Sequence, residues 1–139
     1  MAYEMKKISE FEVGMKNSVV KTITQTDVIL FGAVSQDLNP IHFDHEYAKT
    51  TMFGGPIVHG QLTATLLSAA GAQLTGQGSI YVKDERFFAA PVRVGDTITA
   101  TAEVMDMNIE TKNMHLKLTC TNQKGEIVVE GKATIKFIV

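Results

Sequence analysis

The sequence has a single cysteine and only three prolines, and one long internal stretch carries no charged residue. One cysteine excludes an intramolecular disulfide, so the chain is not a disulfide-stabilised scaffold. Few prolines, with 11 glycines among 139 residues, exclude the collagen-like and disordered classes. The composition is otherwise that of a globular protein, 45% hydrophobic and 20% charged, and it predicts one compact core.

The uncharged stretch runs from Thr50 to Val82, between Lys49 and Lys83. Because the chain has 13 basic and 15 acidic residues, an even spread would place about 6 or 7 charges there. A membrane span is excluded, since glycines, glutamines, threonines and Pro56 interrupt the apolar runs. The first seven residues contain no hydrophobic run and no cleavage-like site. We therefore expect neither export nor a membrane anchor, and a cytoplasmic location.

Several partners and cofactors lack their usual signals. A net charge of −2 and a pI of about 6.1 provide no basic surface for nucleic acid or an anionic membrane. The four histidines do not pair at zinc-ligand spacing, and we predict no metal site. No P-loop, dinucleotide-binding glycine motif or serine-hydrolase elbow occurs, and we predict no cofactor. Cys120 alternates with polar residues along a strand, which indicates a buried, inert thiol.

The residue pattern predicts two short helices, one long helix and five strands. We expect an N-cap at Thr26 for the first helix and at Asp44 for the second, which would span 45–51. The long helix is expected over 58–74, and the strands over 18–24, 79–88, 97–107, 114–121 and 127–137. No face of the long helix is charged, so we expect it to be enclosed nearly all round. The fold class is α+β, an antiparallel sheet wrapped around a central helix.

The first chemical motif is Asp37-x-Asn39-Pro40-x-His42, between the two short helices. A carboxylate and an imidazole five residues apart across an Asn-Pro turn can face one point and hold a water between them, as general acid/base catalysis requires. The same residues also suit turn formation, because Asp and Asn side chains often bond their own backbone. The motif alone supports both roles equally.

The second motif, 56–60, leads into the long helix through His59 and Gly60. The start of that helix lacks a Ser, Thr, Asp or Asn cap, so its first N–H groups are open to an oxygen that gains negative charge. Gly60 would allow close approach to the backbone. For this motif alone, capping by water or by a neighbouring loop is the interpretation we favour, and a histidine such as His59 is more often structural than an acid or base.

Taken together, the motifs resemble the MaoC-like, R-specific enoyl-coenzyme A hydratases of the hotdog-fold superfamily. The resemblance covers about residues 10–137, in which the family's blocks keep their order and spacing. Four blocks carry it: Asp37-x-Asn39-Pro40-x-His42-x-Asp44, Phe53-Gly54-x-Pro56-Ile57-Val58-His59-Gly60, Gly78-Ser79-Ile80-Tyr81 and Pro91-Val92-x-Val94-Gly95-Asp96. It implies a single hotdog hydratase domain over residues 1–139.

The resemblance also implies roles for individual residues. Asp37 and His42 would be the catalytic pair, and the Gly60 N–H would contact the thioester oxygen. Ser68 would line the site, while Asn39 and His59 would support it or the substrate. The reaction would be reversible addition of water to a trans-2-enoyl-CoA, which gives the (R)-3-hydroxyacyl thioester.

Partners and alternatives complete the prediction. The family implies an acyl-CoA substrate and a homodimer or an assembly of dimers. Lys83, Arg86 and Arg93 could meet coenzyme phosphates, but ordinary solvated surface is the interpretation we favour. Two other functions stay open. One is acyl-CoA thioester hydrolysis, and the other is a non-catalytic acyl-CoA-binding module.

Overall fold

The computed structural model describes residues 3–139; Met1 and Ala2, which begin the N-terminal segment discussed above, lie outside the described residues. The elements in chain order are η1 Ile8–Glu10, β1 Lys16–Thr22, α1 Gln25–Ser35, η2 Pro40–His42, α2 His45–Lys49, α3 Gly60–Thr75, β2 Ser79–Phe88, β3 Thr97–Asn108, β4 Asn113–Thr121 and β5 Ile127–Phe137. The predicted helices and strands are therefore present, and two of the strands have the predicted bounds.

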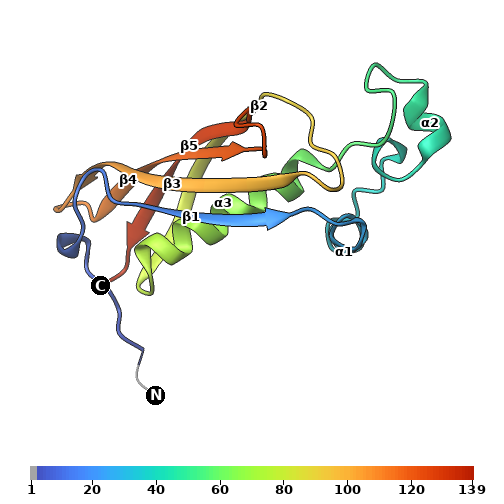
Figure 1. The fold of residues 1–139 in the computed structure, drawn as a ribbon. Helices are drawn as coiled ribbons and strands as arrows, with labels where there is room; N and C mark the ends of the chain where they lie inside the picture. The colour runs from blue at the N-terminus through green and yellow to red at the C-terminus, as the bar shows by residue number, and fades with distance from the viewer. Residues whose placement is uncertain (1–2) are drawn as a thin grey trace.

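The five strands form one antiparallel sheet in the order β1-β3-β4-β5-β2, and α3 lies across its concave side (Figure 1). The alternation of apolar and polar residues decides which face of each strand is buried. In β4 every second residue from Met114 to Cys120 is buried, and the residues between them are exposed or half-exposed. Those buried residues pack with Ala64, Leu67 and Ala70 of α3 in one core. The arrangement confirms the α+β fold class, with a sheet wrapped around a long helix.

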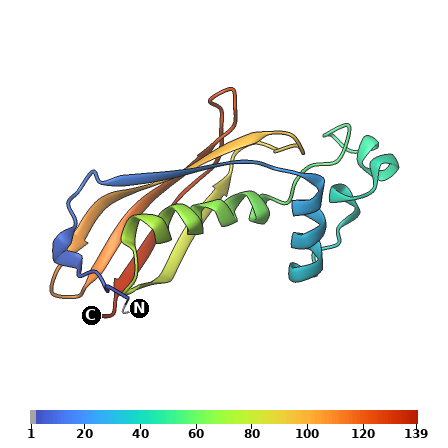
Figure 2. The same ribbon diagram turned by 60° about the horizontal axis from the view of Figure 1, so that its bottom comes forward.

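The segment from α1 to α2 lies beyond one end of the sheet, and the segment that carries η1 and the C-terminus lie near the other end (Figures 1 and 2). Figure 2 shows α1 crossing the line of α3 just past the start of that helix. The residues of both chemical motifs therefore gather at the end of the molecule where α3 begins.

Two predictions about the helices are corrected. The N-cap of α1 is Thr24 rather than Thr26: its hydroxyl accepts from the N–H of Asp27, while the Asp27 carboxylate accepts from the N–H of Thr24. This reciprocal pair satisfies two open donors, which a cap at Thr26 would leave unmatched. The strand before the helix correspondingly ends at Thr22.

The second correction concerns the enclosure of α3. The sheet covers only one side of the helix, and a line of residues on the other side is exposed: Gln61, Thr65, Ser68, Ala72 and Gln73. These side chains are polar or small but uncharged. The absence of charge thus predicted a buried helix, whereas within a single chain α3 is buried on one face.

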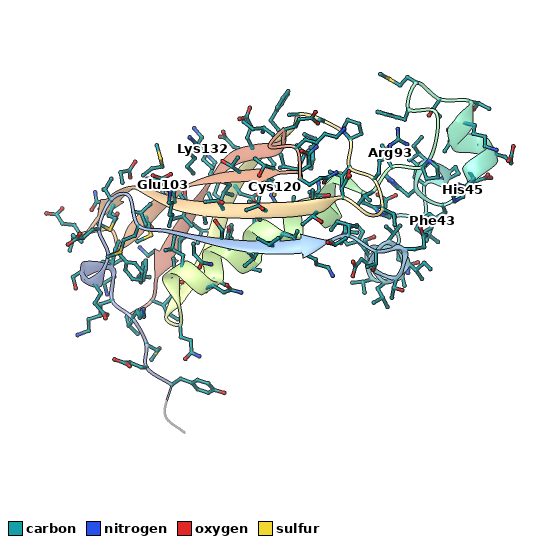
Figure 3. All side chains as sticks on the ribbon, in the orientation of Figure 1. Phe43, His45, Arg93, Glu103, Cys120 and Lys132 are labelled. Atoms are coloured by element: carbon teal, nitrogen blue, oxygen red, sulfur yellow. The ribbon has the colours of Figure 1, made fainter. Side chains whose placement is uncertain are left out.

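Cys120 is buried beneath α3, as predicted, and burial raises the pKa of its thiol to about 12 (Figure 3). A thiol held in this protonated state is a poor nucleophile. Among residues 3–139, no helix has the length and apolar character needed to cross a membrane.

Candidate active site

Between α1 and His42 the backbone makes two turns, each held by a side chain that accepts a backbone hydrogen bond. After α1 the backbone of Gln36 adopts a left-handed conformation, with a φ of 63°. The Asp37 carboxylate then accepts from the N–H of Asn39 at 3.3 Å, and the Asn39 side chain accepts from the N–H of Ile41 at 3.2 Å. Asn39 thereby caps η2, which ends at His42. The motif therefore forms the turns that its composition favours, and those turns fix where Asp37 and His42 lie.

His59, just before α3, joins this loop from a distant part of the sequence. Its Nε2 lies 2.9 Å from the carbonyl oxygen of Asp37, and its ring stacks on the ring of His42 with centroids 3.8 Å apart. Phe31 and Phe43 pack against the remaining sides of the His59 ring. The side chain is 1% exposed. His59 therefore fastens the loop to the start of α3.

The hydrogen bonds of the two rings identify which nitrogens carry protons. The Nδ1 of His42 lies 2.8 Å from the carbonyl oxygen of Ile57, and a carbonyl can only accept. Nδ1 of His42 is therefore the donor, and its Nε2 has a free lone pair when the ring is neutral. By the same argument, His59 donates from Nε2 to Asp37, and its buried Nδ1 has no partner among the described residues. His42 is thus held in the tautomer that a general base needs.

The pKa of His42 is lowered from the ordinary value of 6.5. Burial of the ring is the largest cause, because it disfavours the charged imidazolium, and the neighbouring His59 acts in the same direction. The hydrogen bond to Ile57 and the Asp37 carboxylate oppose this shift. The neutral form of His42 is therefore favoured.

Candidate ligand atoms of Asp37, His42 and His59 lie within 4.8 Å of one another. One carboxylate and two imidazoles can also hold a metal ion. In this cluster, one nitrogen of each imidazole already bonds a backbone carbonyl, and the free Nδ1 of His59 is buried against aromatic rings. The arrangement suits proton transfer at Asp37 and His42 with His59 as support.

Gly60 is the first residue of α3, and no side chain caps the N-terminus of that helix. A methyl group at position 60 would lie 2.6 Å from Cδ1 of Phe88, so the aromatic ring occupies the space that a side chain would need. The backbone N–H groups at this end carry the positive partial charge of the helix. The helix start therefore presents uncapped donors directly beside the His59 anchor.

Arg93 holds the loop that leads into this helix start. Its guanidinium donates to the carbonyl of Pro56 at 3.0 Å and to that of Phe53 at 2.5 Å, and its backbone N–H bonds Asp96. Figure 3 shows Arg93 at the junction between the β2–β3 loop and the segment that carries Phe43 and His45. The expectation of a solvated surface residue was wrong here, because two backbone carbonyls that are distant from Arg93 in the sequence take the place of water.

Ser68 lies apart from the cluster, eight residues along α3 from Gly60. At 1.5 Å per residue this is about 12 Å along the helix axis. The side chain is exposed and lines a hollow of about 400 Å³ between α3 and β2. A second hollow, of about 510 Å³ and mostly apolar, lies at the helix start and is lined by Gly60, Phe53 and Phe88, among others.

Sequence reasoning missed several residues around the cluster. Phe31 and Phe43 enclose His59, Phe88 faces Gly60, and Arg93 holds the loop. Helical spacing places Phe31 on α1, but nothing local indicates that its partner is a histidine 28 positions away. The Phe31 contact depends on where α1 lies relative to the start of α3, and the others depend on loops that are distant in the sequence.

Comparisons with known proteins agree with this geometry. The family described as "MaoC like domain" matches residues 9–125. An (R)-specific enoyl-CoA hydratase of Rhodospirillum rubrum is 43% identical over 127 residues, covering 91% of this chain and 88% of that protein. The enzyme of the same name from Aeromonas caviae is 41% identical, covering 91% of this chain and 95% of its own.

Solved structures show the same fold. An (R)-hydratase from A. caviae involved in PHA biosynthesis superposes with a TM-score of 0.87 at 40% identity, covering 91% of this chain and 97% of that one. The unliganded R-hydratase PhaJ1 of Pseudomonas aeruginosa superposes with a TM-score of 0.85 at 38% identity, covering 93% and 83%. A family match over most of the chain, relatives above 40% identity and a shared hotdog fold show that this protein belongs to the MaoC-like family.

Proposed function

We propose that the protein is an R-specific enoyl-CoA hydratase, a hydro-lyase that also runs in reverse as a 3-hydroxyacyl-CoA dehydratase. The observation that carries the proposal is the convergence of Asp37 and His42 beside the uncapped start of α3 at Gly60. Relatives support it, since two are named (R)-specific enoyl-CoA hydratase and one from Methylorubrum extorquens is named 3-hydroxybutyryl-CoA dehydratase.

In the proposed mechanism, Asp37 and His42 bind one water molecule between them. The thioester carbonyl withdraws electrons from the 2,3 double bond, so C3 is electrophilic. Together, the free Nε2 of His42 and the Asp37 carboxylate take one proton from the water as its oxygen attacks C3. The same pair then gives one proton to C2, so both groups return to their starting protonation states. Hydroxide and proton add across the double bond, and no redox change occurs, so the reaction needs no cofactor.

The start of α3 stabilises the charge that forms during this step. Electrons displaced from the double bond accumulate on the thioester oxygen, and the Gly60 N–H is the donor we assign to it. His59 positions both the loop and the His42 ring, and Asn39 holds the turn between Asp37 and His42. Ser68 is assigned to the far wall, along which a longer acyl chain would have to pass.

A short-chain assay tests the proposal against its alternatives. Purified protein should remove the conjugated-thioester absorbance of a trans-2-enoyl-CoA and yield the R alcohol by chiral analysis. Release of free thiol would instead indicate thioester hydrolysis. Saturable binding of the thioester without product would indicate a non-catalytic binding module, and an S-configured product would contradict the family mechanism.

The pH dependence follows from the lowered pKa of His42. Because the base must be neutral, activity falls as the pH drops through the pKa of His42. That pKa is lowered from 6.5, so we expect the acidic limb of the kcat/KM profile below pH 6.5 and a mainly neutral His42 at pH 7. Measurement of kcat/KM from pH 4.5 to 8 checks this. An acidic limb above pH 6.5 would mean that His42 is not held neutral or is not the base.

The assembly we propose is a homodimer joined through the edge strand β2. The sheet has two edges, β1 and β2. Three apolar residues of β2 are half or more exposed, namely Ile80, Val82 and Phe87, whereas β1 exposes only Val20 to that extent. An unpaired edge that carries exposed apolar side chains is a site for pairing with another chain.

Solution mass measurements test the dimer. Light scattering should give about twice the chain mass of 15.2 kDa. A Phe87→Glu substitution should shift the protein towards the monomer, since it places a charge on the joined edge. Val20→Glu is the matched control, because Val20 is also 65% exposed but lies on the opposite edge. A wild-type monomer, or equal effects of both variants, would contradict the proposed interface.

The remaining assignments follow from the substrate. We propose that residues 1–139 form a single hydratase domain that works in the cytoplasm on acyl-CoA thioesters of fatty acid metabolism. A CoA thioester carries several phosphate charges and does not cross a membrane unaided. Neither a nucleic acid nor a membrane is part of the proposed function.

A further inference from the structure

Two charged residues of β2 face inward, towards α3. Strand alternation is broken by a bulge at Val82, between Tyr81 and Lys83. Beyond the bulge Asp84 and Arg86 continue the helix-facing side that Tyr81 occupies before it. Arg86 is the first cation after the uncharged stretch whose head group turns towards the helix.

Arg86 is held in place by partners on both elements. One terminal nitrogen lies 2.8 Å from the Asp84 carboxylate, and the other donates to the Gln61 side chain of α3 at 3.3 Å. The Arg86 side chain is 20% exposed. Its Nε is buried without an acceptor among the described residues. A buried donor without an acceptor costs stability, so folding alone does not account for it.

The Arg86–Gln61 contact lies between the two hollows described above. Gln61 lines the larger, apolar hollow together with Gly60. Arg86 lines the smaller hollow together with Ser68 and Tyr81. An acyl chain that runs along α3 from the Gly60 N–H to Ser68 therefore meets the Arg86 guanidinium within the first turns of the helix.

We propose that Arg86, held by Asp84 and Gln61, is a specificity-determining residue that closes the path along α3 and restricts the enzyme to short-chain enoyl thioesters. The inference rests on the proposed function, because it takes the thioester carbonyl to lie at Gly60. A long acyl chain would have to displace the guanidinium from its carboxylate or bury methylenes against an incompletely bonded charge, and both disfavour binding. A four-carbon chain has only three carbons beyond its thioester carbonyl carbon, and we expect it to end before the contact.

The test compares chain-length preference between variants. We would measure kcat/KM for trans-2-enoyl-CoAs of four, six and eight carbons with the wild-type protein, Arg86→Ala and Lys132→Ala. The control removes an exposed cation from β5 that lies 3.6 Å from Glu85, on the side of the sheet away from α3 (Figure 3). We expect the wild type to prefer four carbons over eight by tenfold or more. Arg86→Ala should raise the eight-to-four ratio at least tenfold, mainly through KM.

A second variant covers the case in which Arg86→Ala does not fold. Gln61→Ala removes the α3 partner of Arg86, an exposed side chain that also lines the larger hollow. It frees the Arg86 head group and should raise the same ratio. A folded Arg86→Ala or Gln61→Ala protein with the wild-type ratio would overturn this inference and leave the proposed hydratase standing. A wild-type protein that hydrates none of the three thioesters would overturn the proposed function, and the inference with it.

Discussion

Replacement of Asp37 by Asn or of His42 by Ala is expected to lower the kcat for enoyl-CoA hydration by about 10² to 10⁴-fold. Asp37→Asn keeps the shape and the turn-forming carbonyl oxygen that accepts from Asn39. It removes the negative charge that, in the proposed mechanism, binds the water and assists His42 in deprotonating it. His42→Ala removes the free Nε2. Steady-state assays with a four-carbon substrate measure both effects.

The same loop offers matched controls. Asp44→Asn retains a good cap for α2, since the Asp44 side chain accepts from the N–H of Tyr47. His45→Ala changes an exposed histidine on α2 that lies outside the cluster. Both controls should keep wild-type turnover. If folded Asp37→Asn or His42→Ala protein, checked by circular dichroism and Tm, turns over normally, the pair is not catalytic.

Gly60→Ala is expected to lower kcat by about 10²-fold, close to the loss of one oxyanion donor. The added methyl group would lie 2.6 and 2.9 Å from two carbons of the Phe88 ring, so either the ring or the helix start must move. Movement of the helix start takes the N–H away from the thioester oxygen. Because substrate and transition state both need this space, we expect KM to rise as well.

A double variant separates crowding from other causes. Phe88→Ala removes the atoms that the new methyl group would meet, so the Gly60→Ala/Phe88→Ala protein should recover activity relative to Gly60→Ala alone. The kcat of each variant would be referred to that of Phe88→Ala. A folded Gly60→Ala protein with wild-type kcat would argue against Gly60 as the oxyanion contact.

Local patterns predicted most of the fold. Strands with alternating burial, such as β4, were placed within a residue or two, because one dry face imposes a period of two on the sequence. Asp44 was the correct cap for α2. The cap of α1 was misplaced because Thr24 and Thr26 both precede a run of apolar residues, and only the reciprocal bond with Asp27 distinguishes them.

Part of the candidate site could also be predicted from the sequence, for a different reason. Asp37 and His42 are joined by a short turn, so their proximity is local, and the uncapped start of α3 could be seen from the residues missing around it. The stacking of His59 on His42 and the inward turn of Arg86 were not accessible. Both depend on contacts between residues 17 to 25 positions apart, and a bulge at Val82 decides which side of β2 Arg86 faces.

The hydrogen bonds of Arg93 to the carbonyls of Phe53 and Pro56 bear on how the protein responds to heat. Helix α2 packs mainly on the short η2 segment rather than on the sheet. The part of the chain that carries His42 is therefore joined to the sheet and α3 through few contacts. Among them are the two bonds from Arg93 to backbone carbonyls and the contacts of the His59 ring. Regions with few buried contacts open at lower free energy than a core sheet. We therefore expect the end that carries the proposed catalytic pair to open as a weaker cooperative unit, so inactivation on heating should precede melting of the β-sheet.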